Sequence, residues 1–380
     1  MVNATEVTIL HGFEFPTYCN YLEVSEDSKT LLATGGYKPA TSLFDLQEHT
    51  LKVERHADYE LIKGGFIGED WTKIVLLSNV AKIEFQTQFG KHDSVSLPQQ
   101  CRDVKVDKIH ANVVLAGKTG GIHQFSMSTG KFLPSITTQL TSAEEFALNQ
   151  SHTLCAIVGS SKLTSCSAPD KKGICEFIDS RDNKPVRQLF VDAPATSCAF
   201  SENGMLFGVG TEAGIISLYD IRSARPIIEK DHNYDFKIKK IEIKDKKVLS
   251  LDQKGMKVWK SDTGKVLATI QPSFDVNSFT SSEGIVFVGG NSEPMKTYYV
   301  PALGAIPEWC SNLEGVTEEM NEMQKMTYYD QYRFITEDEL ILLKLQKEVG
   351  KAVKPHMHGY LIQHTLYNKH IESNKRPNEK

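Results

Sequence analysis

Short runs of apolar residues alternate with polar turns through roughly the first 300 residues of this chain. One unit shows the order clearly. Its strands are expected at residues 197–200, 206–209 and 215–219, and a fourth strand opens at 227–228. The segments between them contain Gly, Asn, Asp or Pro, which tight turns between antiparallel strands require. The pattern therefore predicts four short β-strands per unit.

A bulky residue recurs late in the third strand of each unit. The steps between these residues are 41, 40, 53, 41, 40 and 40 residues. A period near 40 residues with four short strands per unit is typical of a β-propeller blade. We predict an all-β fold, a seven-bladed β-propeller over residues 5–300. The recurring residues are then blade cores: Phe44, Phe85, Phe125, Ile178, Tyr219, Trp259 and Tyr299.

The last unit shows only three strands before residue 300, and a lone strand at residues 6–10 precedes the first unit. A ring of sheets that stayed open would expose two unpaired strand edges. We therefore predict that residues 6–10 supply the fourth strand of the last blade and close the ring.

The single long step of 53 residues marks an insertion at residues 160–173. Long loops on rigid scaffolds often carry contact residues, so its lysines are candidates for contact with a partner. A solvated insertion that the fold tolerates is the equally weighted alternative. The candidate residues are Lys162, Lys171 and Lys172.

The repeat ends at residue 300, and helical signals follow. Thr336 and Glu339 form a capping-box pattern that predicts a helix ending near Gly350. Pro355 is placed to open a second helix that continues past Tyr360, and residues 318–326 are a weaker helical candidate.

Residues 301–370 are therefore expected to form a helical extension packed on the propeller. Trp309 and residues 332–334 are its predicted anchors, with contact to a partner as the alternative. Residues 371–380 are polar and are expected to be frayed.

Composition narrows the function. The chain of 380 residues has a formal charge of −5, so its bulk charge does not favour nucleic acid. Its seven cysteines are odd in number and lack CxxC spacing, which argues against a disulfide framework or a zinc site. Neither a signal peptide nor an apolar run long enough to span a bilayer is visible. We expect a soluble intracellular protein without membrane contact.

Motifs of common enzymes, including those of zinc proteases, serine hydrolases and P-loop nucleotide hydrolases, do not occur. His356 and His358 flank Met357, but two histidines without further ligands are weak evidence for a metal. We expect no catalytic residues, cofactor, metal or small-molecule substrate. A propeller of this kind is a scaffold for other molecules, and the fold alone does not identify them.

One lysine-rich segment is a candidate for contact with a partner or with RNA phosphates. It covers the first strand of the sixth blade and the turn after it, where Glu242 and Asp245 dilute its charge. The alternative, which we weigh more heavily, is a solvated strand edge whose lysines discourage aggregation. The candidate residues are Lys237, Lys239, Lys240, Lys244, Lys246 and Lys247.

Several segments resemble the nucleolar protein 10 family, also called essential nuclear protein 2. Blade segments at 13–17, 33–45 and 218–232 are similar to the family, but WD-repeat proteins share such motifs widely. The residues after the propeller are more specific, because they follow the family's order and spacing: Pro307, Trp309, Cys310, Tyr329, Asp330, Tyr332, Phe334, Met357, His358 and Gly359.

The resemblance covers roughly residues 5–370 and implies a WD-repeat scaffold of the small-subunit processome. It implies a location in the nucleolus of the nucleus, and a non-enzymatic role in rRNA processing and 40S subunit assembly. The partners it implies are other processome proteins, with pre-ribosomal RNA nearby. The chain departs from the family in lacking a basic insertion before Phe13 and the long charged C-terminal tail, so it resembles a compact form.

Two other functions are compatible with the fold. A propeller is also used as an adaptor in other complexes, such as a ubiquitin ligase. A propeller enzyme would require carboxylates or a nucleophile–base pair gathered at the central pore, with strongly perturbed pKa values.

Overall fold

The computed structural model describes residues 5–6, 18–149, 151, 153–160, 172–291, 295–310, 332–343, 345, 353–356, 358–363 and 366–367. The chain divides into two compact units, Met1–Trp309 and Cys310–Lys380. The predicted helix at 318–326 and the predicted frayed tail at 371–380 lie outside the described residues.

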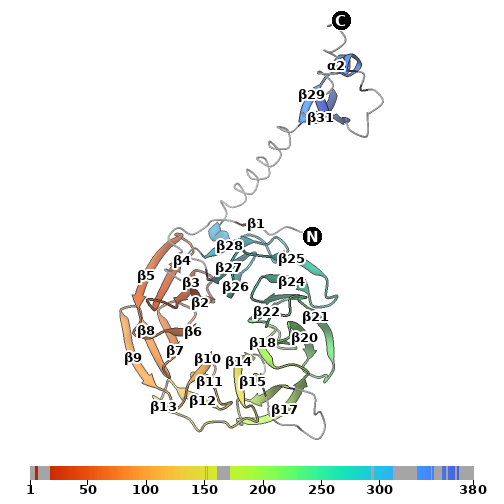
Figure 1. The fold of residues 1–380 in the computed structure, drawn as a ribbon. Coiled ribbons are helices and arrows are strands. Elements are labelled where there is room, and N and C mark those ends of the chain that lie inside the picture. The colour runs from red at the N-terminus through yellow and green to blue at the C-terminus, as the bar shows by residue number, and fades with distance from the viewer. Residues whose placement is uncertain are drawn as a thin grey trace. The chain divides into compact units, whose positions relative to one another are not determined.

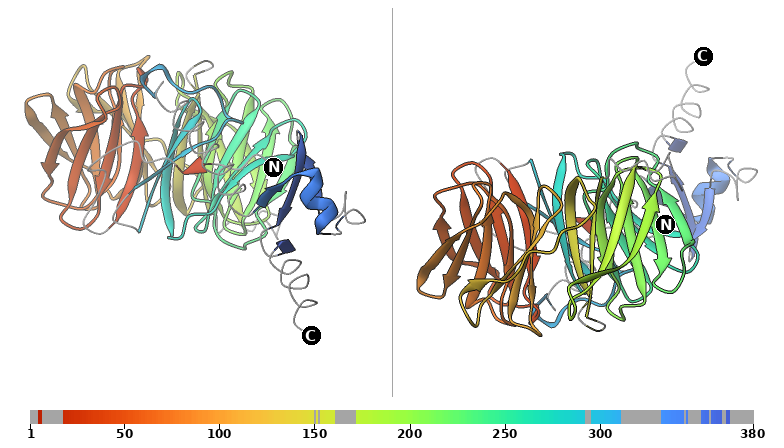
Figure 2. Two further views of the ribbon diagram at one scale, coloured as in Figure 1. Left: turned by 90° about the horizontal axis from the view of Figure 1, so that it is seen from above. Right: turned by 90° about the horizontal axis from the view of Figure 1, so that it is seen from below.

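The first unit is a seven-bladed β-propeller, which confirms the predicted fold class. Seven four-stranded antiparallel sheets stand around a central opening (Figure 1), and they appear edge-on in Figure 2. We number the blades 1–7 in chain order, starting with the sheet that contains Cys19. The first strand of each blade faces the opening: β2 (Cys19–Val24), β6 (Leu61–Phe66), β10 (Cys101–Asp107), β14 (Ser142–Asn149), β18 (Ala195–Phe200), β22 (Lys240–Lys244) and β26 (Val276–Ser282).

The middle strands of each blade are the most buried part of the propeller, because neighbouring sheets cover both of their faces. Each recurring bulky residue predicted from the sequence lies in a third strand. The second strands are β3 (Thr30–Gly35), β7 (Lys73–Ser78), β11 (Asn112–Gly117), β15 (Leu154–Ser160), β19 (Leu206–Thr211), β23 (Lys247–Leu251) and β27 (Ile285–Gly290). The third strands are β4 (Ala40–Asp45), β8 (Lys82–Thr87), β12 (Ile122–Ser126), β16 (Gly173–Asp179), β20 (Ile215–Asp220), β24 (Met256–Lys260) and β28 (Lys296–Tyr299).

The fourth strands form the outer rim and are largely exposed. In blade 7 this strand comes from the start of the chain, where Thr5 pairs with Tyr299 and Glu6 with Tyr298. The remainder of the predicted closing strand, residues 7–10, lies outside the described residues. The fourth strands are β5 (Thr50–His56), β9 (Gly90–Ser96), β13 (Lys131–Phe132), β17 (Lys184–Val191), β21 (Pro226–Asp231), β25 (Val266–Ile270) and β1 (Thr5–Glu6).

A short 3-10 helix, η1 (Glu308–Cys310), spans the boundary between the units. The second unit contains a three-stranded sheet in the order β29-β31-β30 and one helix. Its elements are β29 (Tyr332–Ile335), α2 (Glu337–Leu342), β30 (Val353–His356) and β31 (Gly359–Gln363). It has its own apolar cluster of buried residues: Ile335, Leu340, Leu345, Val353, Ile362 and Tyr367.

The prediction of a second helix beginning at Pro355 is wrong, because residues 353–356 and 359–363 form the antiparallel pair β30–β31. Pro355 is compatible with β30 because this strand lies at the edge of the sheet, where a missing N–H costs no ladder hydrogen bond. The helix predicted from Thr336 exists, but it ends at Leu342 instead of near Gly350, and Thr336 makes no side-chain capping hydrogen bond. The described part of the extension is therefore mixed α and β. Its packing on the propeller stays a prediction.

Candidate functional site

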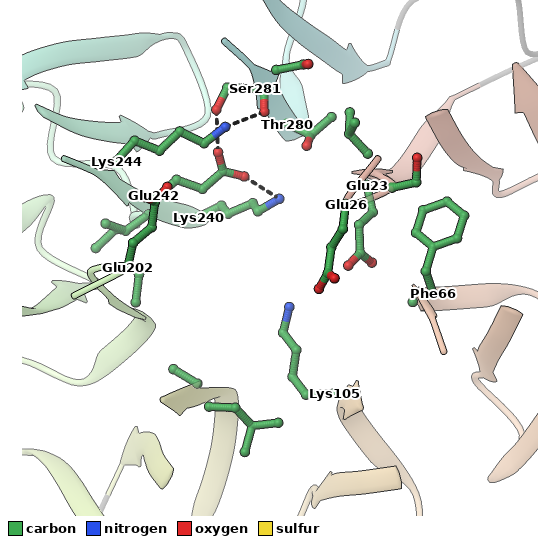
Figure 3. A pocket seen from close by; sticks show the side chains of 18 of the residues that line it. Glu23, Glu26, Phe66, Lys105, Glu202, Lys240, Glu242, Lys244, Thr280 and Ser281 are labelled. Carbon is green, nitrogen blue, oxygen red and sulfur yellow. Dashed lines mark hydrogen bonds and ion pairs between the residues drawn. The ribbon is translucent and has the colours of Figure 1, made fainter. Parts of the chain in front are cut away.

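The first strands enclose a central channel of about 970 Å³ that carries charged side chains on its wall (Figure 3). On β22, Lys240, Glu242 and Lys244 alternate with the buried Ile241 and Ile243. The alternation of a β-strand places the three charged side chains on one face, toward the channel.

These charged groups are held by hydrogen bonds to the neighbouring blade 7. Lys240 Nζ donates to the Phe279 carbonyl at 2.7 Å and lies 3.1 Å from Glu242 Oε1. Lys244 Nζ donates to the Ser281 carbonyl at 2.5 Å, and Ser281 Oγ donates to Glu242 Oε2 at 2.8 Å. Burial would raise the pKa of Glu242, but Lys240, Lys244 and the Ser281 hydroxyl outweigh it and hold that pKa below its ordinary value.

A second network connects the first strands of four blades. Lys63 Nζ, from β6, lies 3.1 Å from Asp103 Oδ1 on β10 and 3.0 Å from Glu145 Oε1 on β14. Asp103 also accepts the Phe146 N–H at 2.8 Å, and Glu145 accepts the Cys198 N–H of β18 at 2.9 Å. Burial lowers the pKa of Lys63, but the two carboxylates outweigh it and raise the value. This network joins blades 2 to 5 around the channel.

Lys105 and Glu23 also face the channel (Figure 3). Burial opposes the charge on Lys105, but Glu23 and the other channel carboxylates raise its pKa above the ordinary value. Burial raises the pKa of Glu23, against Lys105 and Lys240, and its Oε2 accepts the Tyr21 hydroxyl at 3.1 Å. The pKa of Glu23 is raised and that of Glu242 is lowered, but among the described residues of the channel wall neither carboxyl is paired with a nucleophile.

A Ser–His–Asp arrangement does occur in blade 6, but it is structural. His232 Nδ1 lies 2.9 Å from Asp252 Oδ2, and His232 Nε2 lies 2.6 Å from Ser250 Oγ. Trp259 Nε1 donates to the same Ser250 Oγ at 3.2 Å. All four residues are 0 % exposed, so no substrate can reach the hydroxyl. Catalysis by a triad requires an accessible nucleophile.

Asp252 is the centre of this buried group. Its Oδ1 accepts the N–H groups of Lys254 and Gly255 at 2.7 and 2.6 Å. Burial would raise the pKa of Asp252, but the His232 hydrogen bond and the two N–H groups outweigh it and lower the value. The group fixes the turn after β23 against the segment that enters blade 6.

Trp309 packs within the propeller unit, between the blades that close the ring. Its ring stacks on Phe287 of blade 7 with centroids 6.4 Å apart. His49, in the turn between β4 and β5 of blade 1, lies 5.7 Å away on a tilted plane. Trp309 is partly buried, so it anchors the end of the propeller unit at the junction of the first and last blades.

The lysine-rich segment predicted as one site does not form one surface. Lys239 and Lys247 donate to backbone carbonyls of Val276 and Leu303, and Lys240 and Lys244 are held as described above. Lys237 and Lys246 are exposed, but they flank opposite ends of β22, which spans about 17 Å.

In the insertion, Lys172 is exposed, whereas Lys162 and Lys171 lie outside the described residues. Contact of any of these lysines with a partner stays a prediction. Sequence reasoning missed Glu23, Lys63, Lys105, Asp103 and Glu145 as channel residues. The repeat itself could have found them, because all five lie in first strands.

The specific residues after the propeller fall into both units. Pro307 and Cys310 are buried, and Tyr329, Asp330 and Met357 lie outside the described residues. Tyr332 and Phe334 lie on β29, and His358 is exposed in the turn before Gly359.

Gly359 fits this place because it has no side chain. A Cβ there would lie 2.3 Å from Phe334 Cζ and 2.7 Å from the Ile335 carbonyl oxygen. The pair Phe334 and Gly359 therefore sets the close approach of β29 and β31.

Within the described residues, no group of three or more His, Cys, Asp or Glu side chains could hold a metal ion. The described helices include none long and apolar enough to cross a membrane. Seven four-stranded blades, a buried His–Ser–Trp–Asp group and a ring closed by the chain's start define a WD-type β-propeller protein with a small second domain.

Comparison with known proteins identifies the family. The family model described as Nucleolar protein 10-like, N-terminal domain, matches residues 2–324, and the one described as Nucleolar protein 10-like, second domain, matches residues 328–373. The chain belongs to the Nucleolar protein 10-like family.

The relatives agree with this assignment. Ribosome biogenesis protein ENP2 of Saccharomyces cerevisiae is 32% identical over 378 residues, which is 96% of this chain and 52% of that protein. Nucleolar protein 10 of Xenopus laevis is 32% identical, and that of Homo sapiens 30% identical, each over 369 residues, 96% of this chain and 54% of the relative. The chain thus spans about half the length of these curated relatives.

Proposed function

We propose that the protein is a non-enzymatic assembly factor of the small-subunit processome that supports rRNA processing and 40S subunit biogenesis in the nucleolus. The observation that carries the proposal is the family match. Both domain models of the family match the chain in order, and relatives named for ribosome biogenesis or the nucleolus align with 96% of it.

The geometry supports a scaffold over an enzyme. The charged groups of the channel are largely engaged in bonds between blades, and the Ser–His–Asp arrangement of blade 6 is buried. A rigid ring of this kind offers faces and rims to other molecules while its interior is occupied by its own contacts. Its partners are other processome proteins, with pre-ribosomal RNA nearby.

Affinity purification of the tagged chain, with identification of the bound proteins and RNA, tests the proposal. We expect small-subunit precursor particles and precursor rRNA to co-purify. Recovery of a ubiquitin-ligase core without ribosomal precursors would favour the adaptor alternative. A protein that is free of ribosomal precursors throughout the cell would overturn the proposal.

A further inference from the structure

Five exposed cationic side chains lie on one face of blades 5 and 6. Two come from the turn between β20 and β21 and one from the turn between β22 and β23. The last two are the final residue of β24 and a residue of the turn between β24 and β25. We call them the basic rim: Arg222, Arg225, Lys246, Lys260 and Lys265.

Two contacts show that these turns are neighbours. The Ser261 N–H donates to the Lys246 carbonyl at 2.8 Å, which joins the two turns of blade 6. A Cβ on Gly264 would lie 3.4 Å from Ile228 Cγ2, so the outer turn of blade 6 lies against β21 of blade 5. The two blades are adjacent in Figure 1. The three turns therefore form one continuous surface.

The cations of the basic rim are free to bind. Within the described chain, none of the five has a carboxylate within 4.0 Å, in contrast to Lys63 and Lys240 in the channel. The acidic side chains on this face of blades 5 and 6 are Glu202, Asp220, Asp245 and Asp262, and Asp220 Oδ1 is engaged by the Arg222 N–H at 2.9 Å. Positive charge therefore exceeds negative charge on this surface.

The opposite half of the same face has the reverse charge. The turns that follow the first and third strands of blades 1 and 2 carry Glu26, Asp27, Glu48, Glu69 and Asp70. Their cations are fewer, chiefly Lys29 and Lys73. A polyanion approaching this face would be drawn to blades 5 and 6 and repelled from blades 1 and 2.

Hydrogen bonds fix the backbone of the basic rim. The Gly264 N–H donates to the Lys260 carbonyl at 2.9 Å, and the Lys260 N–H donates to the Lys265 carbonyl at 3.1 Å. The Arg225 N–H donates to Ser223 Oγ at 3.2 Å, and Ser223 Oγ donates to the Arg225 carbonyl at 3.3 Å. Because the turns are already ordered, binding orders only the cationic side chains.

The apolar groups beside the basic rim are isolated. Met205 and Ile227 are exposed singly and form no groove for the buried anchors that a protein interface needs. The turns also present no exposed aromatic side chain on which a base could stack. Cations without an apolar anchor or a stacking aromatic side chain favour the phosphate backbone over a folded protein or a stacked base.

We propose that the basic rim binds the phosphate backbone of RNA without sequence specificity. This inference rests on the proposed function, since it assigns the RNA contact of an assembly factor to blades 5 and 6. Each single-stranded phosphate contact contributes about 0.7 to the slope of log K against log salt, so five contacts give a slope of about −3.5.

The test uses the purified full chain and a labelled single-stranded uridine oligonucleotide of about 20 nucleotides, with anisotropy measured across a salt series. The variant Arg222→Glu/Arg225→Glu/Lys260→Glu/Lys265→Glu reverses four of the five cations. We expect at least a tenfold loss of affinity at about 0.1 M salt and a slope that is smaller in magnitude by about 3.

A matched control is Lys29→Glu/Lys38→Glu/Lys73→Glu/Lys118→Glu, which makes the same change in net charge at exposed lysines of blades 1–3. It should retain most of the affinity and nearly all of the slope. Equal losses in the two variants, or no RNA binding by the wild-type chain, would overturn the inference.

A glutamate peptide of the same length is the third arm. If the basic-rim variant kept its RNA affinity but lost the peptide, the surface would bind an acidic protein segment and the inference would be wrong. The proposed function is tested separately, by measuring whether the chain co-sediments with small-subunit precursors. If the chain enters these particles but binds no RNA when purified, RNA binding by the basic rim is refuted and the proposed function is not.

Discussion

Cationic side chains serve two different purposes in the channel and on the basic rim of this propeller. In the channel, the partly buried Lys63 contacts carboxylates of blades 3 and 4, and the partly buried Lys240 donates to a carbonyl of blade 7, so their charge joins sheets together. On the basic rim, Arg225 and Lys265 extend into solvent without an ionic partner in the described chain. A cationic side chain is thus structural where it is desolvated and paired, and available to a ligand where it is not.

The largest expected effect comes from breaking the inner network. Lys63→Met leaves the buried carboxylates of Asp103 and Glu145 without the lysine that bridges them. We expect the free energy of unfolding to fall by about 3–5 kcal/mol, measured by chemical denaturation. Lys73→Met, at an exposed lysine on β7, is the matched control and should change it by less than about 0.5 kcal/mol. If Lys63→Met and Lys73→Met lowered the free energy of unfolding by similarly small amounts, the network would not stabilise the ring.

The buried group of blade 6 should be next in size. Asp252→Ala removes the acceptor of the His232 ring and of two N–H groups, with an expected loss of about 2–3 kcal/mol in denaturant. Because the folded pKa of Asp252 is below its ordinary 3.8, its contribution is full above that value and is lost as pH falls through the folded pKa.

The free energy of unfolding of the Asp252→Ala variant should therefore fall less steeply below about pH 4 than that of the wild-type chain. An identical stability–pH curve in the two proteins would contradict the assignment of Asp252. The basic rim of the same blade should be unaffected, so RNA affinity measured near neutral pH is the internal control.

A smaller effect is expected at the junction of blades 7 and 1. Trp309→Ala removes the stack on Phe287 and the contact with His49, and we expect a loss of about 2 kcal/mol in thermal or chemical unfolding. Trp309→Phe keeps one ring and should recover about half of it. If Trp309→Ala unfolded like the wild-type chain, the indole would be a residue for a partner instead of an anchor.

The smallest effect is expected on the basic rim itself. Arg225→Ala touches no buried group, so the free energy of unfolding should change by less than about 0.5 kcal/mol, measured as for Lys63→Met. If Arg225→Ala lowered the free energy of unfolding by more than about 1 kcal/mol, the basic rim would also be structural, and the contrast with the channel lysines would be lost.

The propeller was predictable from the sequence because its signal is repeated. An error in one strand assignment is corrected by the other blades, and each recurring bulky residue from Phe44 to Tyr299 lies in a third strand. The second unit has no repeat to correct it. There the apolar residues around Tyr360 fit a helix as well as a strand, and only the tertiary pairing of β31 with two neighbours decided between them.

The candidate lysines around β22 are divided between the channel and solvent, and the sequence analysis did not separate them. The prediction treated the segment around β22 as a run of charge, although its order of Lys240, Ile241, Glu242, Ile243 and Lys244 alternates with the period of a strand. That period predicts an inner charged face and a buried apolar face. The basic rim was harder to find, because its cations come from three turns that only the ring brings together.

The pairing of Thr5 and Glu6 with the third strand of blade 7 also sets an order in time. During synthesis, blades 1 to 6 can form as each leaves the ribosome, since their four strands are consecutive in the chain. Blade 7 must wait, with the nascent amino terminus unpaired, until residues beyond Tyr299 have emerged. The sheet of blade 7 can therefore be completed only after β28 has been made, when it pairs with a strand synthesised before blade 1.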